Sequence, residues 1–272
     1  MIKSIQYCDH PILSIITVCR NSERTISTTI KSVLYALNRF ESLEYIIQDG
    51  FSTDNTIHIV NEMTFEHPRI NVFQEVDNGI YDAMNKGMQK ANAKYILYLN
   101  SDDILLEEFS SEYFIRLLDN DLDYIVAPVL FFKRPSLKIR RIWNVGNNKS
   151  NILSRLFLAS YPPHPGFVCK TKHLRKFKFD TRFSIAADYL QMKLITSNKE
   201  LKMNYCKKPI IAMAMGGKSN QLNGLLKASR EIKEIQLITK EKESILIRYI
   251  RNLIQHIIPW FRKERFVKTY FK

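Results

Sequence analysis

The sequence of 272 residues contains little glycine and little proline, and it has no long apolar run. Its eight glycines and nine prolines leave no flexible low-complexity linker, and no internal repeat is visible. Because no stretch reaches about 18 consecutive apolar residues, no standard transmembrane helix is expected. Asp9 and His10 interrupt the apolar stretch at the N-terminus, so no signal peptide is expected either.

Cysteine is also scarce, and its spacing forms no known pattern. Cys8, Cys19, Cys169 and Cys206 are scattered, and none belongs to a CxxC pair. This distribution predicts neither a zinc site nor a disulfide framework. It suits a reducing compartment, which together with the missing signal peptide predicts a cytoplasmic protein.

Acidic residues are few in the second half of the chain. Residues 1–103 contain 9 Lys/Arg and 13 Asp/Glu, whereas residues 104–272 contain 32 and 14. The net charge of +14 therefore belongs to the second half. A basic surface of this kind can meet nucleic acid, anionic lipid or a phosphorylated substrate.

Strand-like and helix-like segments alternate over the first hundred residues. Strands are predicted at Leu13–Cys19, Glu44–Ile47, Ile70–Gln74 and Tyr95–Leu99, and helices at 22–38, Thr53–Met63 (capped by Ser52 or Thr53) and Ile80–Ala91. This alternation predicts an α/β fold with a parallel sheet covered on both faces. Further strands are predicted at Leu122–Val129, Ile139–Val145 and Lys207–Met215, followed by an amphipathic helical stretch over 225–258.

Acidic residues stand at the predicted ends of two strands, where ligands of parallel sheets bind. Asp102 and Asp103 are adjacent, which is costly unless a positive group binds them. Mg²⁺ and Mn²⁺ prefer such oxygen ligands together with substrate phosphates. Asp49 could accept a hydrogen bond from a nucleobase. The alternatives are a solvated turn at Asp102–Asp103 and plain turn and cap chemistry over 49–54, where Asp54 could cap the next helix.

Four separated motifs together resemble the family 2 glycosyltransferases in order and spacing. They lie in SIITVCRN (14–21), EYIIQDGFSTDNT (44–56) and EVDNGIYDAMNKGMQKANAKYILYLNSDD (75–103). The resemblance is close over about 12–105 and loose over 160–220. The segment DNGIYDAMNKG is similar to bacterial members that build surface polysaccharides such as O-antigens. This chain departs from the usual pattern at Gln48, Phe51 and Cys19-Arg20, and its DxD element, Ser101-Asp102-Asp103, lacks the first acid.

The resemblance implies a GT-A fold, a divalent metal (Mn²⁺ or Mg²⁺) and transfer of a sugar from a nucleotide-sugar donor. A UDP-sugar is favoured, with GDP- and dTDP-sugars possible, and the acceptor is a saccharide or a lipid-linked molecule. Thr17 and Cys19 would lie against the base and Asp49 would bind it. Asp102 would contact ribose or sugar hydroxyls beside Ser101, and Asp103 would bind the metal. The donor pocket would be lined by Asp77, Asn85 and Lys86.

A candidate general base stands further along the chain. An inverting transferase needs a base that takes the proton of the acceptor hydroxyl. Asp188, within the AADY segment, resembles a short form of the acidic motif in which the family places this base. The alternative from the residue type alone is a helix N-cap, a role that Asp performs well.

Two further residues could meet the donor. His164 lies in the proline-rich turn Tyr161–Phe167 and could touch phosphate or acceptor, although a lone histidine in a turn is more often structural. Lys218 lies in Gly216-Gly217-Lys218-Ser219, which resembles a loop that closes over the diphosphate in relatives.

The predicted domains are a glycosyltransferase domain over 1–222, with a nucleotide half (1–105) and an acceptor half (106–222), and a basic helical tail over 223–272. Within the tail, apolar residues share one helical face between Ile245 and Phe261, and basic residues follow. This pattern predicts docking on an anionic membrane surface, at the inner face of the plasma membrane. The alternative is a helix packed on the core or on a partner subunit.

Two other functions fit parts of the sequence. A nucleotidyltransferase usually carries a glycine-rich loop after its first strand, but Cys19–Glu23 contains no glycine. A nucleic-acid-binding protein would account for the positive charge. The acidic first half and the missing RRM, KH and zinc motifs argue against it, so no nucleic acid partner is expected.

Overall fold

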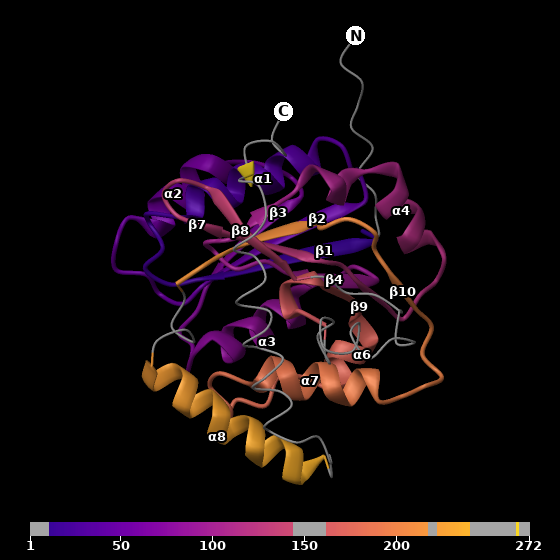
Figure 1. The fold of residues 1–272 in the computed structure, drawn as a ribbon. Coiled ribbons are helices and arrows are strands. Elements are labelled where there is room, and N and C mark those ends of the chain that lie inside the picture. The colour runs from indigo at the N-terminus through magenta and orange to yellow at the C-terminus, as the bar shows by residue number, and fades with distance from the viewer. Residues whose placement is uncertain (1–10, 144–161, 217–221, 240–264, 267–272) are drawn as a thin grey trace.

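The computed structural model of the chain describes residues 11–143, 162–216, 222–239 and 265–266. A main sheet has the strand order β10-β6-β9-β4-β1-β2-β3, and a second sheet has the order β12-β8-β7-β11-β5 (Figure 1). The strands of the main sheet are β1 (Leu13–Cys19), β2 (Leu43–Asp49), β3 (Ile70–Gln74), β4 (Tyr95–Tyr98), β6 (Tyr124–Val126), β9 (Phe167–Lys170) and β10 (Met203–Tyr205). Those of the second sheet are β5 (Ile104–Leu105), β7 (Val129–Lys133), β8 (Lys138–Trp143), β11 (Ile211–Ala214) and β12 (Arg265–Phe266).

The main sheet is mostly parallel. Strand β1 pairs in parallel with β2 and β4, and β2 pairs in parallel with β3. Only β9, between β4 and β6, runs antiparallel to its neighbours. The predicted α/β architecture is therefore confirmed, and the carboxyl ends of β1 to β4 meet at one edge of the sheet.

Helices cover both faces of the main sheet (Figure 1). One face carries α1 (Ile26–Leu37), α2 (Thr56–Thr64) and α4 (Glu112–Asp119); the other carries α3 (Ile80–Lys90), α6 (Thr171–Lys176) and α7 (Ala187–Thr196). Alternate residues of β1 supply the two cores, with Ile15 packed toward α1 and Ile16 toward α3. Helix α3 comes so close to β1 that a Cβ on Gly87 would lie 2.6 Å from the Ile16 side chain. Only glycine fits there.

Several predicted boundaries are wrong. Helix α1 begins at Ile26 instead of residue 22, and α2 begins at Thr56 instead of Thr53. The N-cap of α2 is Asn55, so neither Ser52 nor Thr53 caps this helix. The Thr56 N–H donates a hydrogen bond to the Asp54 carboxylate at 3.0 Å. Side chains in these turns bond to neighbouring loops, and this competes with helix formation.

In the second half of the chain, the observed elements differ more from the predicted ones. The predicted strand Leu122–Val129 is interrupted: its middle forms β6 in the main sheet, and its last residue, Val129, begins β7 in the second sheet. Helix α8 (Leu222–Ile238) matches the start of the predicted helical stretch, and residues 240–258 of that stretch lie outside the described part. No helix within the described ranges has the length and apolar content needed to cross a membrane.

Candidate functional site

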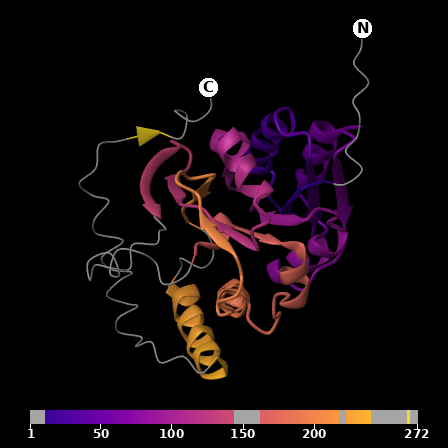
Figure 2. The ribbon, with the colours of Figure 1, turned by 90° about the vertical axis from the view of Figure 1, so that its right-hand side faces the viewer.

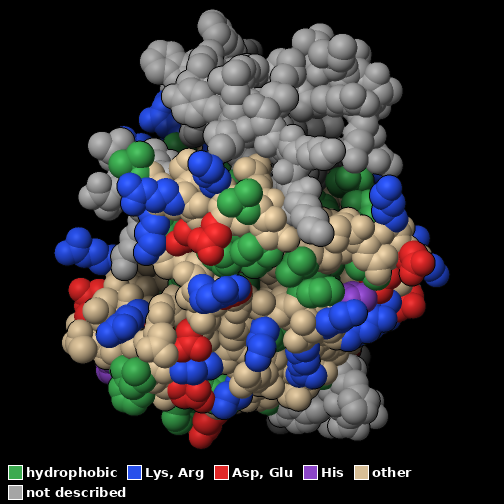
Figure 3. All heavy atoms as spheres, turned by 90° about the horizontal axis from the view of Figure 1, so that it is seen from below, with side chains coloured by type: hydrophobic (Ala, Val, Ile, Leu, Met, Phe, Trp, Pro, Cys, Tyr) green, Lys and Arg blue, Asp and Glu red, His purple; other side chains and the backbone are tan. Residues whose placement is uncertain are grey.

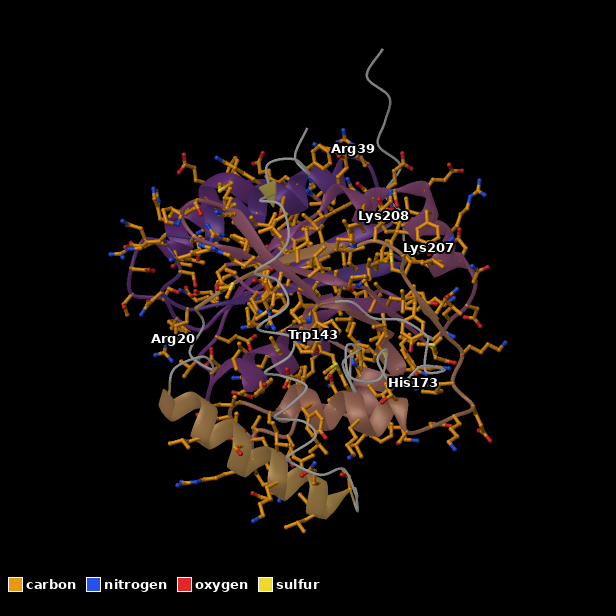
Figure 4. All side chains as sticks on the ribbon, in the orientation of Figure 1. Arg20, Arg39, Trp143, His173, Lys207 and Lys208 are labelled. Carbon is orange, nitrogen blue, oxygen red and sulfur yellow. The ribbon has the colours of Figure 1, made fainter. Side chains whose placement is uncertain are left out.

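Acidic residues gather at the carboxyl edge of the main sheet. Asp49 ends β2, Asp77 follows β3, and Asp102 and Asp103 follow β4. In Figure 4, the labelled Arg20, which follows β1, lies at this edge, whereas His173 of α6 lies on the opposite side of the molecule. The order β4-β1-β2-β3 places these acidic turns next to one another, as the sequence predicts.

Asp49 is fully buried and its carboxylate is well supplied with donors. Its Oδ2 accepts hydrogen bonds from the Ser52 N–H (2.9 Å) and from Gln74 (3.1 Å), and its Oδ1 accepts from the Ser52 hydroxyl (2.5 Å). The Cys19 thiol also donates to Oδ1 at 3.6 Å, and burial followed by the charge of Asp49 raises the pKa of this thiol. Thr17 lies deeper and accepts a bond from Tyr45 at 3.0 Å. Asp49 thus organises the end of β2.

The loops after β1 and β2 interlock. The N–H of Asn21 donates to the Ser52 hydroxyl (2.9 Å), and the side-chain oxygen of Asn21 accepts from the Thr53 N–H (2.8 Å). Phe51, at the tip of the second loop, has a φ of +55° and is 49% exposed. A non-glycine residue in this left-handed region is strained, and such residues cluster at functional sites.

Asp77 lies directly against the β2 turn. Its Oδ1 accepts a bond from the Gly79 N–H at 2.9 Å, and a Cβ on Gly50 would come within 2.1 Å of its Oδ2. Gly50 is therefore required for this approach, and the carboxylates of Asp49 and Asp77 flank the same turn.

Asp102 and Asp103 differ in exposure. Asp103 is fully buried; its two oxygens accept bonds from the Ala214 N–H (2.9 Å) and from Asn100 (3.0 Å). Asp102 is half-buried, and its backbone carbonyl accepts a bond from Arg134 at 2.9 Å. Burial raises the pKa of both carboxyls, and the charge of Asp102 raises that of Asp103 further. A cation would reach Asp102 first. Ser101 beside it is 2.9 Å from the Ser22 hydroxyl.

Two predicted donor-pocket residues are engaged elsewhere. The amide of Asn85 is buried and makes two bonds to the backbone of Phe179, donating at 2.9 Å and accepting at 3.0 Å. Lys86 forms an ion pair with Asp82 (3.2 Å) and donates to the carbonyl of Val76. Asn85 therefore ties α3 to the segment that precedes α7, and Lys86 supports the turn that carries Asp77. Lys218 lies outside the described residues.

Asp188 is the second residue of α7 and is half-buried. The N-cap position belongs to Ala186, so the alternative reading of Asp188 as the N-cap is wrong. Its Oδ1 accepts bonds from the Tyr81 hydroxyl (3.0 Å) and from the Tyr189 N–H (2.8 Å). Tyr81 also lies 2.7 Å from the carbonyl of Ile185. One hydroxyl proton thus serves two acceptors, and the phenol oxygen can still accept a bond.

Aromatic side chains surround His164, and the charge of Asp188 acts on its imidazole. The imidazole stacks on Tyr98 with ring centroids 5.4 Å apart and meets Phe179 edge-on at 5.6 Å. Burial lowers the pKa of His164, and the charge of Asp188 opposes this shift. The His164 Nε2 and the Tyr98 hydroxyl are buried and have no hydrogen-bond partner among the described residues. Buried polar groups of this kind are normally satisfied, so they fit a ligand or water.

Sequence reasoning missed Tyr81, Tyr98, Arg134 and Phe179. Tyr81 stands inside the DNGIYDAMNKG motif, so a signal for it was available. Nothing in the sequence relates Tyr98 and Phe179 to His164, because these contacts join segments distant in the chain.

This fold and these carboxylates define an α/β enzyme whose site lies beyond the strand ends of a mostly parallel sheet. The family model described as "Glycosyl transferase family 2" matches residues 14–183. The chain belongs to this family. Neither the nucleotidyltransferase nor the nucleic-acid-binding alternative finds support in the comparisons. Asp188 and α8 lie beyond the matched residues.

Two curated relatives extend the comparison. The chain is 24% identical over 267 residues to the minor teichoic acid biosynthesis protein GgaB of Bacillus subtilis, covering 91% of this chain and 29% of that protein. It is 29% identical over 168 residues to a poly-beta-1,6-N-acetyl-D-glucosamine synthase of Staphylococcus epidermidis, covering 60% and 35%. The chain thus spans about a third of the length of these relatives.

Two solved structures share the GT-A fold. The S. aureus TarS fragment 1–349 in complex with UDP has a TM-score of 0.58 and 18% identity, covering 83% of this chain and 65% of that one. The mannosyltransferase PcManGT from Pyrobaculum calidifontis, in complex with GDP-Man and Mn²⁺, has a TM-score of 0.60 and 16% identity, covering 92% and 71%.

Proposed function

We propose that the protein transfers a sugar from a nucleotide-sugar donor to a saccharide or lipid-linked acceptor in cell-surface polysaccharide biosynthesis, with a divalent metal and with inversion. The observation that carries this proposal is the half-buried Asp102 at the carboxyl end of β4, backed by the buried Asp103, in a family 2 chain. The relatives named for teichoic acid and poly-N-acetylglucosamine synthesis support the biosynthetic setting.

The donor would bind across the turns that follow β1, β2 and β4. Its base would lie at Thr17, Cys19 and Asp49, and its sugar or diphosphate near Ser101, Asp77 and the loop of Lys218. Because Asp49 already accepts bonds from Ser52 and Gln74, base binding would exchange one of these donors for a base N–H. A UDP-sugar is favoured, because TarS structures contain UDP and UDP-GlcNAc, while PcManGT contains GDP-Man.

The geometry favours Asp102 as the metal ligand over Asp103, the residue that the family resemblance implies. Both oxygens of Asp103 already accept hydrogen bonds inside the protein, whereas Asp102 is reachable. One carboxylate with donor phosphates is an ordinary site for Mg²⁺ or Mn²⁺. When bound, the metal would offset the charge that develops on the leaving diphosphate. Arg134, beside Asp102, would add a fixed positive charge.

Asp188 would accept the proton of the acceptor hydroxyl. Tyr81 and Tyr189 hold its Oδ1, which leaves Oδ2 to face the acceptor. Once Asp188 carries the proton on Oδ2, its Oδ1 can still accept the hydrogen bonds from the Tyr81 hydroxyl and the Tyr189 N–H. The arrangement therefore accommodates Asp188 both before and after proton transfer. The unpartnered Tyr98 hydroxyl and His164 Nε2 would meet sugar hydroxyls.

A donor screen tests this proposal. Thermal unfolding is followed with UDP-, GDP- and dTDP-sugars, each with and without Mn²⁺. A ligand that binds only the folded state raises the unfolding temperature. One donor should do so more strongly with Mn²⁺, and its product should have inverted anomeric configuration. No response to any donor, or a product with retained configuration, contradicts the proposal.

We further propose that the basic second half docks on the anionic inner face of the plasma membrane. Figure 3 shows the lower face of the molecule, with Lys and Arg side chains spread among hydrophobic ones. On α8, Lys227, Arg230 and Lys233 are exposed beside Leu226 and Leu237. Each basic group near an anionic leaflet contributes about 1 kcal/mol. The predicted membrane helix, 245–261, lies outside the described residues.

Liposome flotation tests the docking. The full chain should float with vesicles containing anionic lipid at low salt, and a chain ending at Lys242 should float less. Equal flotation of both chains means that the tail is not the anchor. No flotation of the full chain refutes the docking.

A further inference from the structure

Helix α8 packs beneath α7. Figures 1 and 2 show the two helices side by side from two directions. Ile235 of α8 is fully buried and belongs to the same apolar cluster as Ala187 and Leu190 of α7. Glu231, one turn before Ile235, is only 7% exposed although it is an acid. A buried acid on a docked helix requires a specific partner.

That partner is the backbone at the start of α7. The Oε1 of Glu231 accepts bonds from the Ser184 N–H (3.0 Å) and the Ser184 hydroxyl (3.1 Å). Its Oε2 accepts bonds from the N–H groups of Ile185 and Ala186, each at 2.9 Å. Three consecutive backbone N–H groups thus point at one carboxylate.

These bonds fix the residues that lead into α7, and the last of them satisfies the N–H of the N-cap residue, Ala186. Ala186, the N-cap residue of α7, has no side chain that could serve as a cap. A carboxylate is stabilised at a helix N-terminus by the unsatisfied N–H groups and by the helix dipole. Burial opposes the charged form of Glu231, but the bonds from Ile185, Ser184 and Ala186 outweigh it and lower its pKa. Glu231 is therefore ionised and bound to this segment at neutral pH.

The segment that Glu231 holds also carries the base. Asp188 follows Ala186 by two residues, and the Ile185 carbonyl is the second acceptor of the Tyr81 hydroxyl. A shift of residues 184–186 would move both acceptors of Tyr81 together. The proposed donor contacts lie on other elements, namely the turns that follow β1, β2 and β4. Such a shift would therefore leave donor binding intact.

We propose that Glu231 is a positioning residue for transfer: it fixes the start of α7 from a separate helix and so holds Asp188 in reach of the acceptor. This inference rests on the proposed role of Asp188 as the base. It gives α8 a part in the reaction, beyond the residues matched by the family model.

The test uses the full chain with Glu231→Gln, which keeps the size of the side chain but sets an NH₂ group against backbone N–H groups. Misplacement by about 1 Å can cost roughly 100-fold in rate. We expect kcat to fall roughly 10- to 100-fold, with the KM for donor unchanged. Glu234→Gln is the matched control, because Glu234 lies on the same helix but is exposed; its kcat should equal that of the wild type.

A double-mutant cycle separates positioning from a general loss of structure. If Glu231 acts through Asp188, Glu231→Gln should have little further effect in the Asp188→Asn background. Equal effects in both backgrounds, or an unchanged kcat in Glu231→Gln, overturn the proposal. If Asp188→Asn itself retains wild-type activity, the proposed base is wrong and the inference falls with it. Circular dichroism and donor calorimetry check folding. Should Glu231→Gln not fold, Glu231→Asp, whose shorter carboxylate keeps the charge, must show the same loss of kcat.

Discussion

The two edges of the main sheet use acidic residues in opposite ways. At the amino edge, acids pair with basic side chains: Asp121 with Lys94 (2.9 Å) and Lys170 (2.8 Å), and Asp123 with Lys170 (3.4 Å) and His173 (2.8 Å). At the carboxyl edge, the acids accept hydrogen bonds from neutral N–H, O–H and S–H groups, as Asp49 does from Ser52. The fold thus supplies basic partners for Asp121 and Asp123, whereas the bonds to Asp49 and Asp103 come from uncharged groups.

This difference separates acids with a structural role from the acids to which the proposed function assigns a ligand. Opposite charges within about 4–6 Å lower the pKa of a carboxyl, whereas burial beside a second carboxylate raises it. Asp121 and Asp123 show the first shift, and Asp102 and Asp103 show the second. A cation is therefore favoured at the carboxyl edge and has little to gain at the amino edge.

The largest expected effect is that of Asp188→Asn. Asparagine keeps the shape of the side chain but cannot accept the acceptor proton, so transfer should slow by roughly 10²–10⁴-fold. Donor binding, measured by calorimetry, should stay at the wild-type level. A turnover rate near that of the wild type would remove Asp188 from the mechanism.

Asp102→Asn should cost about 100-fold or more in transfer, because the proposed metal would contribute several kcal/mol to stabilising the leaving group. Added Mn²⁺ should then stimulate activity little.

Asp103→Asn should instead lower the unfolding temperature, because it disturbs the buried bonds to Ala214 and Asn100. A stable Asp103→Asn protein whose activity no longer depends on Mn²⁺ would identify Asp103, and not Asp102, as the metal ligand.

A smaller effect is expected from Gly50→Ala. The new Cβ would displace the Asp77 carboxylate, which is the end of a movable side chain, so the fold should survive. The KM for donor should rise about tenfold, the value of one hydrogen bond to a charged group. Steady-state kinetics at saturating acceptor measure this change. An unaltered KM would exclude Asp77 from the donor pocket.

At the amino edge, Asp123→Asn should leave kcat and KM unchanged and should reduce stability only. Burial opposes the charge of Asp123, but His173, the Lys202 N–H and Lys170 outweigh it and lower its pKa from 3.8 to about 2. This difference corresponds to about 2 kcal/mol, present above pH 3.8 and lost as the pH falls through about 2. Urea unfolding at several pH values should show the two proteins converging below pH 4. A constant gap would contradict the ion-pair account.

The nucleotide half of the fold was predictable because its signals are local. Leu13–Cys19 is a short apolar, β-branched run, and the observed limits of this strand and of Ile70–Gln74 agree with the prediction. Helix starts were less accurate, since Asp54 accepts a bond from the Glu23 N–H and Asn21 from the Thr53 N–H, across loops that only the tertiary structure brings together. The division of Leu122–Val129 between two sheets also depends on distant partners, β9 and β11.

The candidate site was predictable as a set of residue types, and less so in the role of each. Asp49, Asp77 and Asp102 fall at strand ends, where periodicity alone places them. Burial then distinguishes Asp102 from Asp103, and it commits Asn85 to the Phe179 backbone. Glu231 could not be found from the sequence, because its partners lie 45–47 residues away.

The central claim is that a divalent metal binds with the nucleotide at the carboxyl edge, through Asp102. Mn²⁺ binding is measured by the EPR signal of the free ion at neutral pH, with the nucleotide selected by the donor screen, in the wild type, Asp102→Asn and Asp123→Asn. The account predicts that Asp123→Asn binds Mn²⁺ as the wild type does, whereas Asp102→Asn binds it at least about tenfold more weakly. Unchanged Mn²⁺ affinity in Asp102→Asn, or a loss in Asp123→Asn, would contradict it.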